Sequence, residues 1–234
     1  MDVRCTMPTR TSQPEIASLR PATPAARLAT GIELLLVYAG ILLYIWRWQF
    51  TYPRTWIPLL AVVLASHVVH REGLPDLGLS WRGLRASASL ILPLASAVYL
   101  VLILYGFATR TLAFTMLSKR TLVMFVTYGL WCLFQQYLAQ SYIHNRLMLL
   151  FRNQHLSSLL VGLMFGAAHI PNPVLLLATS VGGFVLAEVY ARHRNIWPLA
   201  LAQAVGGFLI AALTPPALIH NMRVGPGYFT YGLR

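Results

Sequence analysis

Three glutamines in one apolar stretch are the first residues whose types and spacing bear on chemistry. Gln135, Gln136 and Gln140 lie in the segment Trp131–Ser141, within about one and a half turns of a helix. Gln136 and Gln140 are spaced i, i+4 and share a helix face, whereas Gln135 lies about 100° round the axis from Gln136. This spacing predicts either carboxamides that line a polar interior or amides that hydrogen-bond neighbouring helices to one another.

A second polar group closes a helix of small residues in the segment Phe165–Pro173. His169 stands near the predicted end of that helix, and Asn172 lies between two prolines. A single histidine near a helix end more often has a structural role than a ligand-binding one. Asn172 is expected to make a turn or to cap the following helix.

A third polar group lies on the last predicted helix. Pro198 falls in the first turn of that helix, where proline is well tolerated, and Gln203 follows about one and a half turns later. Gly207 comes next on the same helix, four residues after Gln203. Glu188 precedes this group, and its i, i+4 spacing to Arg192 predicts an ion pair.

These segments do not have the ligand grouping of a metal site. Zinc needs three or four His, Cys or carboxylate ligands, and here one histidine stands opposite glutamines. The sequence also lacks a Walker loop and a dinucleotide-binding glycine fingerprint. We therefore expect neither a metal nor an organic cofactor.

The elements that carry these residues are strongly apolar. Of 234 residues, 57% are hydrophobic and 10% are charged, against roughly 25% charged in a soluble domain. Several apolar segments reach the ~20 residues that cross a ~30 Å hydrocarbon core, whereas two are shorter and leave the count between six and eight. The sequence predicts an all-α, polytopic transmembrane helix bundle, because helices satisfy their own backbone hydrogen bonds in lipid. The seven predicted spans are Leu28–Trp46, Trp56–Val69, Ala86–Ala108, Thr121–Gln140, Ser157–Ala168, Val174–Tyr190 and Ile196–Leu213.

The formal charge of +12 does not indicate a nucleic-acid partner, because the basic residues lie between apolar spans and form no continuous aromatic and basic surface. They are interpreted as topological anchors, Arg146 among them. Most of them fall on the side of the N-terminus, which predicts a cytoplasmic N-terminus. Lys119 is the one lysine among 18 basic residues, a bias typical of a GC-rich bacterial genome and hence of a bacterial cytoplasmic membrane.

Three regions are expected along the chain. Residues 1–27 are rich in Arg and Pro and lack the apolar region of a signal peptide, which favours a disordered cytoplasmic tail. Residues 28–213 form the membrane domain. Residues 214–234 form an interfacial tail, because Pro215 and Pro216 end the last helix and aromatic residues follow. The stretch from His70 to Arg85 is predicted either to lie at the interface or to form an ordinary cytoplasmic loop.

In order and spacing, the three polar groups resemble the motifs of the CAAX-protease and bacteriocin-processing (CPBP) family of intramembrane proteases. The resemblance covers residues 74–213. The family's first motif, E-E-x-x-x-R, falls on Gln135, Gln136 and Gln140. The fold that the resemblance implies is a helical membrane bundle.

The second and third motifs agree with this chain to different degrees. F-x-x-x-H is matched by Phe165 and His169. H-x-x-x-N falls on Gln203 and Gly207, after an Ile196-Trp-Pro helix start similar to that of relatives. Of the residues to which the resemblance assigns catalysis, only His169 is kept.

The resemblance implies that the first glutamate of the family is the general base on a water, and that the histidines and asparagine position this water and stabilise the oxyanion. A carboxamide has no basic lone pair near neutral pH, so Gln135 positions a water but cannot deprotonate it. Losing the base removes about 10²–10⁴-fold in rate and losing oxyanion donors a further ~10²–10³-fold. The sequence therefore predicts a catalytically impaired pseudoprotease.

Three functions are left open. The first is a pseudoprotease in the lipid bilayer that binds a hydrophobic or lipidated peptide, or another membrane protein, in a cavity lined by amides. The alternative is an active CAAX-type endopeptidase with a rearranged site, in which His169 is the base and is aided by Glu188 or another histidine. A transporter or channel is disfavoured, because no broken-helix pair or inverted repeat is visible.

Overall fold

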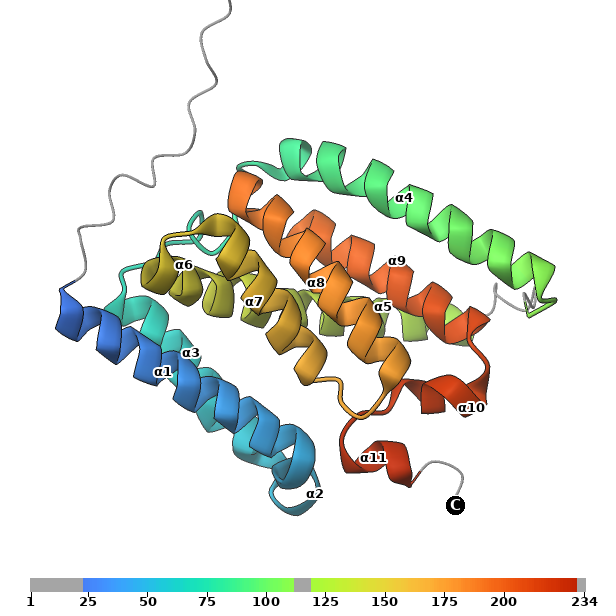
Figure 1. The fold of residues 1–234 in the computed structure, drawn as a ribbon, viewed down its shortest axis with the longest axis horizontal. Coiled ribbons are helices and arrows are strands. Elements are labelled where there is room, and N and C mark those ends of the chain that lie inside the picture. Colours follow the sequence, from blue (N-terminus) through green and yellow to red (C-terminus); the bar gives the residue numbers. More distant parts are fainter. Residues whose placement is uncertain (1–22, 112–118, 231–234) are drawn as a thin grey trace, which may run out of the picture.

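The computed structural model describes residues 23–111 and 119–230, and within these ranges the chain is helical and forms no strand (Figure 1). Each of the seven predicted apolar segments coincides with a helix, which confirms the all-α fold class. The predicted tail of residues 1–27 lies mostly outside the described residues. The seven helices are α1 (Pro24–Leu43), α3 (Trp56–Val69), α4 (Leu84–Ala108), α5 (Lys119–Gln136), α7 (Gln154–Ala167), α8 (Pro173–His193) and α9 (Trp197–Leu213).

The lengths and surfaces of these helices are those of a multi-pass membrane protein. Within the described ranges, four continuous helices are long and apolar enough to cross a bilayer: Pro24–Thr51, Leu84–Ala108, Thr121–Phe151 and Pro173–His193. Pro53–Val69 and Trp197–Leu213 are shorter apolar helices. Large apolar side chains such as Leu36 and Val101 are about two-thirds exposed (65% and 66%), as expected where lipid and not water is the solvent.

The first two spans form a hairpin at one edge of the molecule (Figure 1). Helix α1 continues through a π-helical turn η2 (Tyr44–Trp48) and a short α2 (Gln49–Thr51), and the 3-10 turn η3 (Pro53–Thr55) leads into α3. Tyr38 joins the hairpin to the rest of the bundle, because its hydroxyl donates to the Met164 carbonyl of α7 at 2.7 Å.

The remaining spans pack closely through small residues. Cβ atoms at Gly162 and Gly166 would overlap Ser180 of α8, so α7 and α8 approach more closely than larger side chains would allow. On the other face, α4 packs on α9, and the Tyr99 hydroxyl donates to the Ala202 carbonyl. Gly162 and Gly166 therefore lie where α7 and α8 meet.

The fourth predicted span is longer and less regular than expected. Helix α5 continues without a break through the π-helix η4 (Tyr137–His144) into α6 (Asn145–Phe151). A π-helical stretch has wider turns than an α-helix and is frequent at functional sites. Every residue of η4 from Ala139 onward is buried, which places this irregular stretch inside the bundle.

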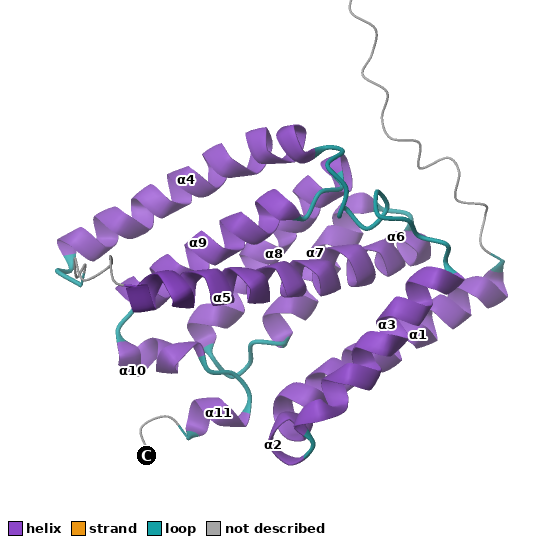
Figure 2. Ribbon diagram, turned by 180° about the vertical axis from the view of Figure 1, so that it is seen from behind, coloured by secondary structure: helices purple, strands orange, loops and turns teal. Residues whose placement is uncertain are grey.

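The loop of residues 70–83 and the α8–α9 connection lie at one end of the bundle, named here the loop end (Figure 2). The Ile196 amide donates to the Gly78 carbonyl at 3.0 Å, and Trp81 stacks on Trp197 with 6.2 Å between ring centroids. Gly83 has a left-handed φ of 72°, and a Cβ there would overlap the His193 carbonyl. The loop is therefore held against α8 and α9, while Trp81 stays exposed.

The α7–α8 turn and the C-terminal segment lie at the opposite end, the tail end (Figure 2). Helix α9 stops before Pro215, and the tail forms α10 (Pro216–Ile219), η5 (His220–Met222) and α11 (Pro226–Phe229). Asn172 accepts from the Leu175 amide at 3.1 Å and so caps α8 as predicted. Its Nδ2 donates to the Ile219 carbonyl at 2.7 Å, so the tail packs on the α7–α8 turn.

Candidate functional site

Helices α5 and α9 bring three of the predicted glutamines together. Gln136 Nε2 donates to Gln203 Oε1 at 2.6 Å, and Gln203 Nε2 donates to Gln135 Oε1 at 2.6 Å. Two neighbouring amides of α5 therefore hold one amide of α9 from both of its ends. Gln136 is fully buried, whereas Gln135 and Gln203 are half-buried.

The amide chain extends along η4 to a histidine that the sequence did not place there. Gln140 Nε2 donates to Gln136 Oε1 at 3.2 Å, and His144 Nδ1 lies 3.2 Å from Gln140 Oε1. Because a carbonyl oxygen only accepts, His144 donates from Nδ1, and its Nε2 carries the lone pair of the neutral ring. That Nε2 is buried and has no partner among the described residues.

This five-residue amide chain is polarised in one direction. Starting at His144, each member donates to the next, through Gln140, Gln136 and Gln203 to Gln135. Hydrogen bonds in such a series strengthen one another, and the links between the five members are made without a charge. Gln135 closes the chain, and the described part of the protein offers no acceptor for its Nε2. Both N–H groups of the Gln135 amide therefore remain available at the half-buried end.

His169 is not joined to this chain by any hydrogen bond among the described residues. It lies at the tail end, just after α7, where Nδ1 donates to the Phe165 carbonyl at 2.7 Å and lies 3.3 Å from Thr179 Oγ1. The Phe165 ring stands perpendicular to the imidazole at 5.0 Å. The two residues of the F-x-x-x-H motif thus contact each other and α8.

The position of Gly207 is filled by a neighbouring aromatic residue. A Cβ at Gly207 would overlap the hydroxyl of Tyr128, which comes from α5. The glycine therefore leaves room for a phenol where a larger side chain would not fit. Nothing in the local sequence pattern pointed to Tyr128.

Glu188 lies at the loop end, and its partners do not include His169. Its predicted pair with Arg192 is confirmed at 3.6 Å, and His155 Nδ1 and Gln154 Nε2 also donate to its carboxylate, at 3.0 and 3.1 Å. On α8 it lies nine residues beyond Thr179, the residue beside His169, which is roughly 13 Å along a helix axis. Glu188 therefore cannot orient His169 in this structure.

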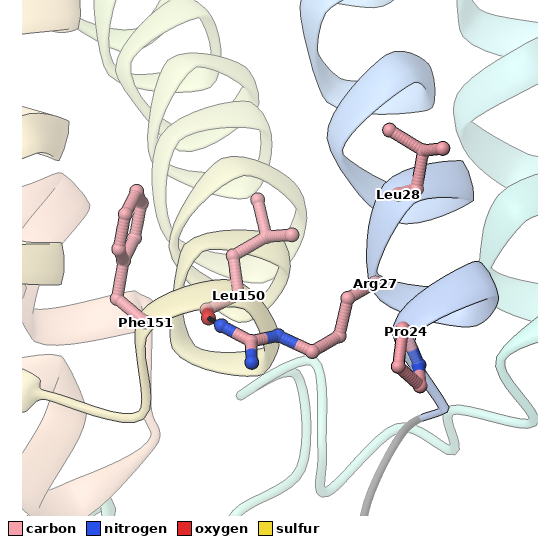
Figure 3. A pocket seen from close by; sticks show the side chains of 5 residues that line it. All are labelled: Pro24, Arg27, Leu28, Leu150 and Phe151. Carbon is pink, nitrogen blue, oxygen red and sulfur yellow. Dashed lines mark hydrogen bonds between the residues drawn. The ribbon is translucent and has the colours of Figure 1, made fainter.

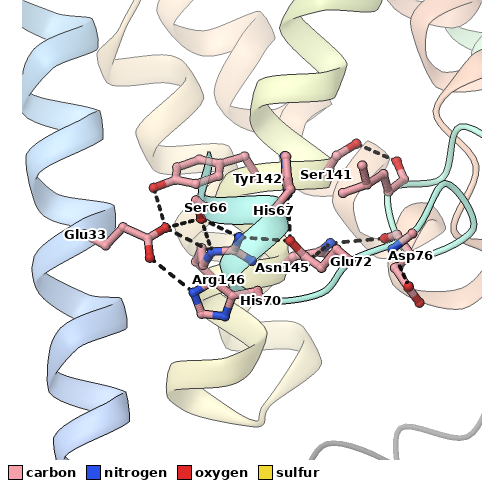
Figure 4. Close-up of polar contacts among 12 residues, drawn as sticks. Glu33, Ser66, His67, His70, Glu72, Asp76, Ser141, Tyr142, Asn145 and Arg146 are labelled. Carbon is pink, nitrogen blue, oxygen red and sulfur yellow. Dashed lines mark hydrogen bonds and ion pairs between the residues drawn. The ribbon is translucent and has the colours of Figure 1, made fainter. Parts of the chain in front are cut away.

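A buried ionic cluster next to the amide chain was missed by the sequence analysis. Arg146, expected as a surface anchor, is fully buried, and it lies between Glu33 of α1 and Glu72 of the loop (Figure 4). Its Nε is 3.1 Å from Glu33 and its Nη2 is 2.9 Å from Glu72. A guanidinium inside a membrane bundle needs such partners, so an arginine at the end of a long apolar span was the signal for this cluster.

Other polar groups complete the cluster around the two carboxylates. Glu33 also accepts from Ser66, from the Tyr142 hydroxyl at 2.9 Å and from His70 at 3.2 Å. Glu72 accepts from His67 Nδ1 at 2.7 Å and from Asn145 Nδ2 at 2.9 Å. These contacts connect the loop to four helical elements: α1, α3, η4 and α6.

Charge and hydrogen bonding decide the ionisation of Glu72, which lies in the loop outside the spans. Burial alone raises the pKa of its carboxyl. The hydrogen bonds from His67 and Arg146 and the positive charge of Arg146 act in the other direction and prevail, lowering the pKa to about 2. The carboxylate is therefore charged at any physiological pH. Across residues 23–111 and 119–230, no group of three or more His, Cys, Asp or Glu is placed to hold a metal ion.

Comparison with known proteins identifies a family for this chain. The family model described as type II CAAX prenyl endopeptidase Rce1-like matches residues 86–209. The match includes the whole amide chain, His169 and Arg146, and it leaves out the α1–α3 hairpin and the loop that supply the carboxylates. No curated protein and no solved structure matches the chain.

Proposed function

The chain belongs to the type II CAAX prenyl endopeptidase Rce1-like family, and from this membership we propose that it is a pseudoprotease that binds a lipidated or hydrophobic peptide without cutting it. The amide chain is the observation that carries the proposal. At the positions where the family motif has two glutamates, an arginine and a histidine, this protein has four glutamines that hydrogen-bond to one another.

Peptide hydrolysis needs a group that accepts a proton from water and donors that stabilise the oxyanion. A carboxamide does not accept a proton near neutral pH, and here the amide oxygens already accept from neighbouring amides. Without a base and without the asparagine at Gly207, we expect no more than residual turnover.

Binding a peptide requires neither a general base nor oxyanion donors. A free N–H of Gln135 can donate to a peptide carbonyl, and a neutral hydrogen bond of this kind contributes about 1 kcal/mol. The apolar surface of the surrounding helices can hold a lipid chain by burial. Since the family description names a prenyl endopeptidase, we infer a prenylated C-terminal peptide as the class of guest.

The test uses the purified full chain in nanodiscs with prenylated and unprenylated peptides of one sequence. Binding is measured by fluorescence anisotropy, and cleavage by mass spectrometry of the same samples. We expect saturable binding of the prenylated peptide, no product, and a several-fold weaker affinity for Gln135→Ala. Gln49→Ala is the matched control, because Gln49 lies on α2 outside the family match and its amide donates locally to Ile45.

The alternative function, an active CAAX-type endopeptidase with a rearranged site, is favoured by the free Nε2 of His144. This lone pair belongs to a residue that is hydrogen-bonded to the amide chain, and it is a proton acceptor without a partner among the described residues. His169 is the second candidate base. Cleavage that is lost in His144→Ala or His169→Ala, and kept in Gln49→Ala, would establish the enzyme and refute the pseudoprotease.

A further inference from the structure

An open groove lies at the loop end between the start of α1 and the end of α6 (Figure 3). It has a volume of about 410 Å³. No member of the amide chain lines it, although His144 precedes Leu150 by six residues on the same continuous helix. Five residues line it: Pro24, Arg27, Leu28, Leu150 and Phe151. One of them is charged and the other four are apolar.

The charged residue is held in place but not neutralised. Figure 3 shows Arg27 reaching from α1 towards the Leu150 carbonyl, to which its Nη2 donates at 2.5 Å. Among the described residues, no carboxylate lies within ion-pair distance of Arg27. Glu33 and Glu72 are bound to Arg146, and Glu188 is bound to Arg192. The Nε and Nη1 of Arg27 therefore remain free to donate.

The apolar residues of the groove lie at the ends of membrane spans. The span Pro24–Thr51 begins at the groove, and the span Thr121–Phe151 ends there. Leu28 is 66% exposed and Phe151 is 45% exposed, so both present apolar surface to the surroundings. A guanidinium at this level stands at headgroup depth, with apolar side chains on either side of it.

We propose that this groove is a specific site for one anionic glycerophospholipid. The phosphate would accept from two N–H groups on one edge of the Arg27 guanidinium, one of them the N–H of Nη2 that does not bind the Leu150 carbonyl. An acyl chain would run along Leu28 and Phe151. The chain contains 18 basic and 6 acidic residues, and this positive net charge favours an anionic lipid over a zwitterionic one. The proposal is independent of whether the protein cuts or binds peptides.

The first test is native mass spectrometry of the purified full chain with phosphatidylglycerol or phosphatidylcholine that carry the same acyl chains. We expect the wild type to retain one phosphatidylglycerol per chain in preference to phosphatidylcholine. Arg27→Gln should weaken this retention roughly tenfold, the loss expected when a charge-assisted hydrogen bond is removed. Arg27→Lys should keep part of the preference for phosphatidylglycerol, because lysine keeps the positive charge but cannot donate two parallel hydrogen bonds as a guanidinium does.

Arg54→Gln is the matched control, since Arg54 is exposed in η3 at the other end of the same hairpin. A second readout locates the lipid: Phe151→benzoylphenylalanine should cross-link phosphatidylglycerol, whereas the same change at the exposed Phe50 should not. Thermal unfolding of each variant shows that it is folded.

Four results would overturn the proposal. These are equal retention of both lipids, an Arg27→Gln variant that binds like the wild type, competition by inorganic phosphate alone, and a cross-link from position 151 to a second copy of the chain.

Discussion

At the residue scale, Glu72 shows how a polar residue of a loop becomes part of the membrane bundle. Its carboxylate accepts from His67 of α3 and from Asn145 and Arg146 of α6. These bonds favour the charged form, which is why the pKa lies at about 2 in place of the ordinary 4.5. A carboxylate whose pKa is lowered in the folded protein stabilises the fold above its unfolded pKa.

The pH dependence follows from the sign of this shift. Glu72 should stabilise the fold fully above about pH 4.5 and progressively less as the pH falls towards 2. Since its side chain is 13% exposed, the pKa difference corresponds to about 3 kcal/mol. We therefore expect Glu72→Gln to lower the thermal stability at pH 7 and the difference from the wild type to shrink towards pH 3. A difference that does not change with pH would show that the charge of Glu72 is not what stabilises the fold.

The sequence indicated the glutamines but not their partners. The shared helix face of Gln136 and Gln140 followed from their i, i+4 spacing, and the structure confirms that both side chains are buried. His144 continues the same spacing by four from Gln140, a signal that was present and was not used. Arg146 was misread because basic residues next to spans are most often anchors, and its partners Glu33 and Glu72 are distant from it in the sequence.

At the element scale, the close contact between α7 and α8 depends on which glycines face the neighbouring helix. Gly166 faces α8, so that a Cβ there would overlap the Ser180 side chain. Gly182 lies on α8, yet a Cβ there would meet nothing within 4 Å. The apolar lengths in the sequence were enough to predict these helices, but they did not tell which glycine is at the contact.

The two glycines provide a matched pair of substitutions. We expect Gly166→Ala to destabilise the protein by about 1–3 kcal/mol through overpacking, and Gly182→Ala to be neutral or slightly stabilising. Thermal unfolding in detergent measures both changes. Equal effects of the two substitutions would contradict the close α7–α8 contact.

The π-helix η4 is the element that sequence patterns did not predict. The segment reads as a regular apolar helix with glutamines, and the wider turns are visible only in the structure. A π-helical stretch leaves some backbone bonds less favourable, so it persists where tertiary contacts stabilise it. Here Ser141 donates to the Leu77 carbonyl at 2.6 Å and Tyr142 donates to Glu33, contacts to the loop and to α1.

At the scale of the whole molecule, the family-matched region lacks the partners of its own arginine. Residues 86–209 contain Arg146, whereas Glu33, Ser66 and Glu72 come from the preceding 85 residues. The hairpin and the loop are therefore part of the same folding unit as the matched helices. Leaving a charged side chain buried without its partners lowers the free energy of unfolding by about 3–5 kcal/mol.

Full-length variants test this dependence. We expect the double variant Glu33→Gln and Glu72→Gln to lose about 3–5 kcal/mol of stability, because Arg146 stays buried without a counter-ion. Adding Arg146→Met should restore most of the loss by removing the charge. Arg152→Met is the control, since Arg152 is exposed and should change stability by less than about 0.5 kcal/mol. A triple variant that is no more stable than the double one would refute the explanation.

The C-terminal tail has a consequence for how lipid-borne molecules reach the interior. Gly225 donates to the Ile170 carbonyl at 2.9 Å, and its Cα lies so close to Ile45 of η2 that a side chain would overlap the Ile45 carbonyl. The α1–α3 hairpin therefore packs against this segment at the tail end, is hydrogen-bonded to α7 through Tyr38, and is held at the loop end by the ion pair of Arg146 with Glu33. Separation of the hairpin from α7 would have to break all three of these contacts together, so a peptide or lipid from the bilayer should enter through another face of the bundle.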